Sequence, residues 1–162
     1  MKDFINERWR PILAHNGLSD FDALWKLKAE WFEEPNHRRG GWSGVSRCEL
    51  ALPQGGTCAI FLKRQENHKA RLWTHPVRGA PTFLREFRHI QHYRACGIPT
   101  LEPVYFAMHK VGKDERAILV TEELTGFVSM EDRVRRWLKE GAPARPVRLR
   151  MLAAVAALLR DM

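Results

Sequence analysis

The chain of 162 residues is 44% hydrophobic and 28% charged, which excludes wholesale disorder and predicts one domain with a sizeable core. Its longest apolar run, Met151 to Leu159, is too short to cross a bilayer, and the charged N-terminus lacks the apolar stretch of a signal peptide, so we expect a cytoplasmic protein. A net charge of +8 predicts either a polyanionic partner (nucleic acid, phosphorylated glycolipid or an anionic membrane face) or an ordinary solvated basic surface.

The first part of the chain reads as helical. An apolar-faced segment is followed by a short helix from Ser19 to Lys28, where Ser19 and Asp22 form a capping-box-like pattern. Pro35 and Asn36 then mark a turn. We therefore expect residues 1–36 to form an N-terminal helical extension. The apolar face of the first segment carries Phe4, Trp9, Ile12 and Leu13.

The periodicity changes after a glycine-rich stretch at residues 38–44. Val45 to Leu52 and Thr57 to Arg64 are strand-like runs, and Pro53-Gln54-Gly55-Gly56 between them is a strong turn signal, so the pair predicts a hairpin.

The chain's three cysteines form no C-x-x-C pair, which argues against a disulfide framework or a zinc ribbon and for reduced thiols. They are Cys48, Cys58 and Cys96.

A helix is predicted next. A loop containing Pro76, Gly79 and Pro81 leads to Thr82, which is a suitable N-cap residue. Phe83, Phe87 and Ile90 then recur at the spacing of an amphipathic helix, and Gly97-Ile98-Pro99 ends it.

A second hairpin and two further helices complete the pattern. Glu102 to His109 and Arg116 to Glu122 are strand-like runs around a turn at residues 111–114. Ser129 and Asp132 form a second capping-box-like pattern, which opens a helix that Gly141 closes. A linker with two prolines precedes the final helix, whose apolar positions are Leu152, Val155, Leu158, Leu159 and Met162.

This order of elements predicts an α+β fold. Two hairpins with one inserted helix favour an antiparallel sheet, because parallel βαβ units would alternate more regularly. The same order of elements matches a protein-kinase-like N-lobe (an antiparallel sheet plus one αC-like helix) followed by the first helices of a C-lobe. We expect the N-lobe at residues 37–124, and the exit from the hinge with the start of the helical C-lobe at residues 125–162.

A site for ATP needs a flexible cover over the phosphates, a cation that contacts them and an anion that holds the cation in place. Backbone N–H groups of Gly40, Gly41, Ser43 and Gly44 could approach phosphate oxygens. The stretch matches neither a Walker A loop nor the G-x-G-x-x-G-x-V spacing, and a plain turn is the alternative interpretation.

Lys63 is the candidate cation. It ends the apolar run Ala59-Ile60-Phe61-Leu62, which resembles the V-A-I-K strand motif. Glu86 lies 23 residues later and borders the apolar stripe of the predicted helix, so a Lys63–Glu86 ion pair would hold the ammonium group toward phosphates. The alternative is an ordinary surface glutamate.

The end of the last predicted strand is the candidate adenine contact. Thr121-Glu122-Glu123-Leu124 follows the apolar run 117–120, and Thr125-Gly126 loosens the chain directly afterwards. At such a hinge, backbone groups of Glu122 to Leu124 would form the hydrogen bonds to adenine.

We predict no metal-binding residue in the chain, because His89 and His92 lack a third ligand.

Four segments together resemble the lipopolysaccharide kinase family, in particular its InaA branch, whose relatives include WaaP-type heptose kinases and Kdo kinases of Gram-negative bacteria. Each segment is unspecific alone, whereas the ensemble is specific and spans about residues 30 to 140. The segments are Arg38 to Arg47, Phe61 to His68, Phe83 to Phe87 and Ile118 to Leu124.

The resemblance implies a protein-kinase-like fold with ATP and Mg²⁺ as cofactors. It implies Lys63 as the phosphate-binding lysine, Glu86 as its helix partner and Glu122 to Leu124 as the hinge. The acceptor would be an inner-core sugar of lipopolysaccharide or another anionic glycolipid, at the cytoplasmic face of the inner membrane. Nucleic acid is not an expected partner.

The sequence departs from the family beyond the hinge. A full member continues into a catalytic loop with a base Asp and a metal-binding Asn, then a second metal-binding Asp, and no such motif follows Arg160-Asp161-Met162. We therefore expect a C-terminally truncated chain that is inactive alone. The alternative is a non-catalytic basic binding protein, a degenerate kinase lobe that holds nucleotide or anionic lipid.

Overall fold

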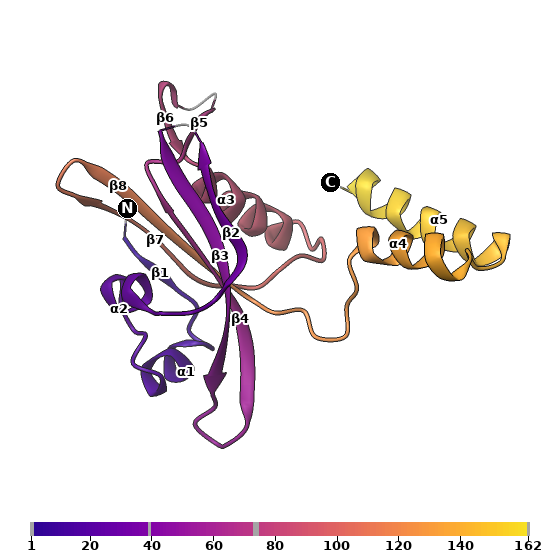
Figure 1. The fold of residues 1–162 in the computed structure, drawn as a ribbon, viewed down its shortest axis with the longest axis horizontal. Helices are drawn as coiled ribbons and strands as arrows, with labels where there is room; N and C mark the ends of the chain where they lie inside the picture. The colour runs from indigo at the N-terminus through magenta and orange to yellow at the C-terminus, as the bar shows by residue number, and fades with distance from the viewer. Residues whose placement is uncertain (1, 39, 73–74, 162) are drawn as a thin grey trace.

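The computed structural model describes residues 2–38, 40–72 and 75–161. Strands, with three helices among them, occupy the first three quarters of the chain, and two helices follow (Figure 1). The elements are β1 (Phe4–Ile5), α1 (Arg10–His15), α2 (Phe21–Lys26), β2 (Trp31–Arg38), β3 (Gly41–Ala51), β4 (Thr57–Glu66), β5 (Lys69–Leu72), β6 (His75–Pro81), α3 (Thr82–Ala95), β7 (Pro103–Val111), β8 (Asp114–Glu122), α4 (Met130–Glu140) and α5 (Arg145–Asp161).

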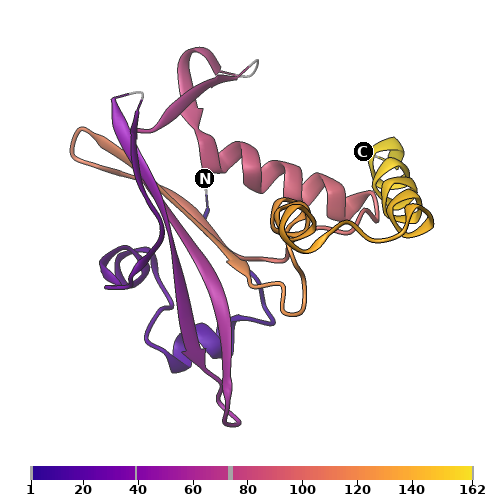
Figure 2. The ribbon, with the colours of Figure 1, turned by 45° about the vertical axis from the view of Figure 1, so that its right-hand side comes forward.

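The main sheet has six strands in the order β1-β7-β8-β4-β3-β2, and every neighbouring pair is antiparallel. Helices α1 and α2 cover one face, and α3 lies on the other (Figure 2). Strands β5 and β6 form a separate two-stranded sheet. The structure therefore has the α+β organisation with an antiparallel sheet and one helix inserted between the hairpins that the sequence predicted.

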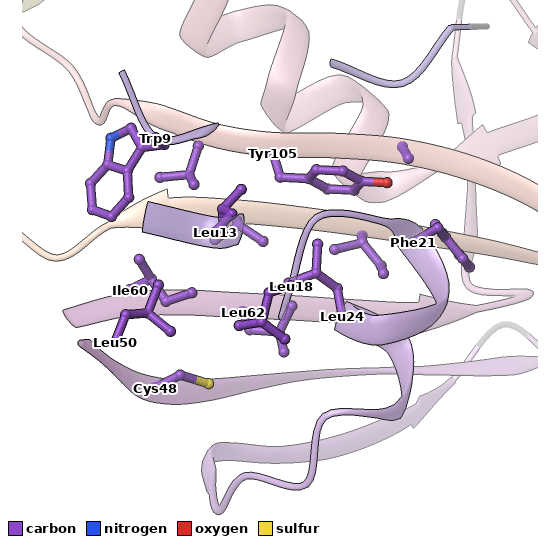
Figure 3. Packing of buried hydrophobic residues seen from close by; sticks show 14 residues of the cluster. Trp9, Leu13, Leu18, Phe21, Leu24, Cys48, Leu50, Ile60, Leu62 and Tyr105 are labelled. Carbon is purple, nitrogen blue, oxygen red and sulfur yellow. The ribbon is translucent and has the colours of Figure 1, made fainter. Parts of the chain in front are cut away.

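The two faces of the sheet form two cores because side chains alternate along each strand. Ile118 and Val120 of β8 face α1 and α2, where they join Leu62 and Tyr105 in the larger cluster (Figure 3). Leu119, between them, faces α3 instead. A single central strand thus contributes to both cores, which fixes its register against the neighbouring strands.

The predicted stripe of α3 packs on the second face. Phe83, Phe87 and Ile90 are buried there against Phe106 and Leu119. The rings of Phe87 and Phe106 are stacked with centroids 4.3 Å apart. This stacked pair holds the middle of α3 against β7.

The N-terminal part of the chain is only partly the helical extension that the sequence predicted, because strands flank α1 and α2. Phe4 and Ile5 form β1 at one edge of the sheet, and the segment from Trp31 forms β2 at the other edge. The predicted turn at Pro35 is wrong, and the predicted boundary at residue 36 falls inside β2. Proline is tolerated because β2 is an edge strand and the register shifts between Glu33 and Asn36.

Three smaller predictions are also corrected. Asp20, rather than Ser19, caps α2 by accepting a hydrogen bond from the backbone N–H of Ala23 at 2.9 Å. Thr82 is the first residue of α3, and Pro81 occupies the N-cap position without a side-chain acceptor. The predicted loop containing Pro76, Gly79 and Pro81 is instead strand β6, which pairs with β5.

Helices α4 and α5 lie to one side of the sheet, and an extended segment after β8 connects them to it (Figure 1). The predicted caps are confirmed, since the Ser129 hydroxyl accepts from the Asp132 N–H at 3.0 Å and Gly141 ends α4 with a φ of 91°. Neither helix has a buried residue among those described. Within the described ranges, no helix combines the length and apolar character needed to span a membrane.

Two glycines of β3 are required by close contacts. A Cβ atom at Gly41 would lie 2.0 Å from the carbonyl oxygen of Glu66, and one at Gly44 would lie 2.7 Å from the ring of Trp31. Because the first contact is with backbone, no side-chain rotation can relieve it. These glycines therefore permit β2, β3 and the end of β4 to pack tightly.

We expect Gly41→Ala to lower the free energy of unfolding by about 1–3 kcal/mol, the usual effect of inserting a methyl group into a filled space. Urea denaturation measures this. Ser43→Ala on the same strand is the control and should stay within about 0.5 kcal/mol of wild type. Equal stability of the two variants would show that the β3–β4 contact is looser than described.

Candidate nucleotide site

A cleft of about 660 Å³ lies between the sheet, α3 and the segment after β8. Clefts of this size commonly bind small molecules, with mostly apolar walls and a few convergent polar groups. Its lining is contributed by six parts of the chain: Phe32 and Glu33 of β2, Val45 of β3, Phe61 and Lys63 of β4, Phe83 and Glu86 of α3 with Leu101 after it, Thr121 and Glu122 of β8, and Glu123, Leu124 and Phe127–Ser129 of the connecting segment.

The main charged feature of the cleft is the Lys63–Glu86 ion pair. The Lys63 ammonium donates a hydrogen bond to Glu86 Oε1, and the two side chains are 17% and 34% exposed. Strand β4 presents Lys63 on the α3 face, and Glu86 sits one turn into α3, between Phe83 and Ile90 of the buried stripe. The ion pair that the sequence predicted is therefore present, and its role toward phosphate stays a prediction.

Apolar side chains form the walls beside this pair. Phe61 precedes Lys63 by two residues, so it lies on the same face of β4. The ring of Phe32 meets Phe61 edge-on, with centroids 5.0 Å apart. Val45 pairs directly with Lys63 across the β3–β4 ladder. A flat apolar slot thus adjoins a cation, an arrangement that suits an aromatic ring carrying an anionic group.

The chain after β8 closes one side of the cleft. Thr121 is 1% exposed, and the backbone of Glu123 donates to the carbonyl of Ala59 at 3.0 Å, which fixes the start of this segment. Among the described residues, the N–H of Leu124 has no hydrogen-bond acceptor. Leu124 therefore offers a backbone donor at the edge of the cleft, and its role as a hinge contact stays a prediction.

The side chain of Glu122 turns away from the cleft, because it follows Val120 on the α1–α2 face of β8. Only the backbone of this residue can serve as a hinge contact. Its carboxylate lies 3.7 Å from the guanidinium of Arg8, which also binds Glu102 at 2.8 Å. Burial and the neighbouring carboxyl of Glu102 raise the pKa of Glu122.

The glycine-rich segment lies apart from the cleft lining. Within the described part of the chain, Gly40, Gly41, Ser43 and Gly44 do not line the cleft, whereas Val45 does. Gly41 pairs with the end of β2, and Gly44 pairs with Arg64, one position beyond Lys63. The close contacts of Gly41 and Gly44 explain those two glycines without a ligand. A phosphate-binding role for this segment stays a prediction.

Sequence reasoning missed the aromatic walls. Phe61 could have been identified from the two-residue period that places it beside Lys63. Phe32 could not, because the polar residues after it and Pro35 concealed strand β2.

The raised pKa of Glu122 predicts a pH effect on stability. The folded state binds this proton more tightly than the unfolded chain, so ionisation of Glu122 costs stability as pH rises above the ordinary value of 4.5. We expect Glu122→Gln to be more stable than wild type at pH 7, with an advantage that disappears as pH falls to 4.5 and below. Urea denaturation across this range measures it, with exposed Glu34→Gln as the control. A difference that does not change with pH would contradict the assignment.

Comparisons with known proteins identify the family and the fold. The family model for the lipopolysaccharide kinase (Kdo/WaaP) family matches residues 22–162. Protein InaA of Escherichia coli (strain K12) is 33% identical over 146 residues, which cover 88% of this chain and 63% of InaA. A solved structure of WaaP in complex with acyl carrier protein superposes with a TM-score of 0.63 at 21% identity, over 99% of this chain and 56% of that one.

The chain thus spans somewhat more than half the length of the relatives that it matches. The likeness to WaaP shows the fold, and the family match, from α2 to α5, includes every described residue that lines the cleft. The chain belongs to the lipopolysaccharide kinase (Kdo/WaaP) family.

Proposed function

We propose that the cleft binds ATP and that the protein transfers the terminal phosphoryl group to an inner-core sugar of lipopolysaccharide. The observation that carries the proposal is the Lys63–Glu86 pair at the wall of an otherwise largely apolar cleft. A lysine on a strand held by a glutamate from the adjacent helix is the arrangement that protein kinases require for phosphoryl transfer. Family membership supports the same reaction class.

Each part of the cleft suits one part of the nucleotide. Val45 and Phe61, which share one face of the sheet, would pack against one side of the adenine ring, and the N–H of Leu124 would donate to one of its ring nitrogens. Lys63 would contact the phosphates, where its charge offsets that of the oxygens. Glu86 would prevent the ammonium group from moving to solvent. The N–H groups around Gly40 would cover the phosphates from the β2–β3 end.

The described residues do not supply a site for Mg²⁺, which neutralises phosphate charge in phosphoryl transfer. They contain no group of three or more His, Cys, Asp or Glu side chains placed to hold a metal ion. Near the cleft, Glu86 pairs with Lys63, and Glu123 pairs with Arg47 at 2.7 Å. We therefore assign no step to Mg²⁺ here.

The acceptor and location are further parts of the proposal. The net charge of +8 suits a phosphorylated glycolipid at the cytoplasmic face of the inner membrane. Exposed arginines of α4 and α5 supply part of this charge, among them Arg133, Arg136, Arg148 and Arg150. Incubating a whole family member with labelled ATP and lipopolysaccharide tests this part, since transfer to protein alone would contradict it.

Nucleotide binding is tested by calorimetric titration of the purified chain with Mg·ATP. We expect saturable binding that Lys63→Met weakens by about tenfold or more, because a charge-assisted contact with phosphate is lost. Glu86→Ala should weaken it by a smaller factor, because the lysine keeps its charge but loses its orientation.

Lys113→Met and Glu140→Ala are the matched controls, since both residues are exposed and lie outside the cleft. Their affinities should equal that of wild type. A folded chain that binds no Mg·ATP, or one that loses affinity equally with all four substitutions, would overturn the nucleotide assignment.

A further inference from the structure

We propose that Gln65 is a positioning residue that sets α3 on the sheet so that Glu86 reaches Lys63. This inference rests on the proposed nucleotide site and deepens it. Gln65 follows Lys63 by two residues on β4, so both side chains point to the α3 face. Although glutamine is usually exposed, Gln65 is 0% exposed, and its amide oxygen is bound to the first two residues of α3.

Gln65 supplies the cap that α3 lacks. The first N–H groups of a helix have no partner within it, and the N-cap residue Pro81 offers no side-chain acceptor. Gln65 Oε1 accepts from the backbone N–H of Phe83 at 3.0 Å and from the hydroxyl of Thr82 at 2.8 Å. Its Nε2 donates to the carbonyl oxygen of His68 at 2.6 Å.

The same strand therefore holds the same helix at two points. Lys63 binds Glu86, and Gln65 binds Thr82 and Phe83 three to four residues earlier. The two attachment points are about 6.7 Å apart along the strand and roughly one helical turn apart along α3. Two such contacts define both the position and the rotation of α3, whereas the ion pair alone would allow the helix to pivot.

Burial strengthens the second attachment. Phe83 and Gln65 are both buried, so water cannot replace their hydrogen bond. Breaking this bond would therefore leave a buried donor and a buried acceptor without partners. In protein kinases the position of the corresponding helix decides whether the lysine–glutamate pair forms. Here the hydrogen bonds from Thr82 and Phe83 to Gln65 keep the Lys63–Glu86 ion pair formed in the absence of nucleotide.

The pair can be measured without nucleotide. A carbodiimide joins a carboxyl group to an amine that is already in contact with it, so the rate of Lys63–Glu86 cross-linking, read by mass spectrometry of peptides, reports the pair. We expect Gln65→Met, which keeps the side-chain length, to lower this rate by at least about twofold. Gln91→Met, on the exposed face of α3, is the matched control and should leave it unchanged.

Thr82 provides a milder pair of variants, in case Gln65→Met folds poorly. Thr82→Val removes the hydroxyl that binds Gln65 and should slow cross-linking, whereas Thr82→Ser keeps the hydroxyl and should restore the wild-type rate. A role in stability alone would lower the urea midpoint of Gln65→Met and Thr82→Val without changing the cross-linking rate of the folded protein. An unchanged rate therefore overturns the proposal.

The affinity for Mg·ATP provides an independent test. If Gln65 acts through the pair, Glu86→Ala should weaken binding by a smaller factor in the Gln65→Met background than in wild type, because the pair is already disrupted. Additive effects would overturn the positioning role. If wild type binds no Mg·ATP while Gln65→Met still slows cross-linking, the positioning role stands and the proposed function fails.

Discussion

The two-residue period of strand β4 is the constraint on which the rest of the structure depends. Its odd-numbered residues Phe61, Lys63 and Gln65 face α3 and the cleft, and its even-numbered residues face the helices before the sheet. Hydrogen bonds to β3 on one side and β8 on the other hold the strand in register over its length. A slip of one residue would exchange the two faces and remove the ammonium group from the cleft.

The opposite face of β4 stabilises this register. Arg64 is 7% exposed, and its guanidinium donates to the carbonyl oxygens of Trp25 at 3.0 Å and Leu27 at 2.8 Å. It also lies over the ring of Trp31, 4.9 Å from the centroid. Burial lowers the pKa of Arg64. Adjacent residues of one strand thus fasten the N-terminal helices on one face and α3 on the other.

Much of this arrangement follows from sequence patterns that act locally. The stripe of Phe83, Phe87 and Ile90 defines α3, and the turn at residues 53–56 defines the β3–β4 hairpin. The Lys63–Glu86 pair could be predicted because a lysine that follows an apolar run within a strand must either reach solvent or face a site with a partner for its charge.

The parts that escaped prediction depend on distant contacts. Strand β2 is rich in polar residues and contains Pro35, and only pairing with β3 at the sheet edge makes it a strand. Gln65 lies in a polar run that resembles a strand end, and nothing local shows that it caps a helix 17 residues later. The tight packing of Gly41 on the end of β4 also could not be predicted, because no local sequence pattern indicates it.

We propose that Lys63 contacts the phosphates of a nucleotide in the cleft. An acyl phosphate of ATP tests it directly, because this reagent transfers its acyl group to a lysine amine beside the bound phosphates. We predict acylation that is concentrated on Lys63 and blocked by excess ATP, as read by mass spectrometry of peptides. Labelling spread over exposed lysines such as Lys110 and Lys113, without protection by ATP, would contradict it.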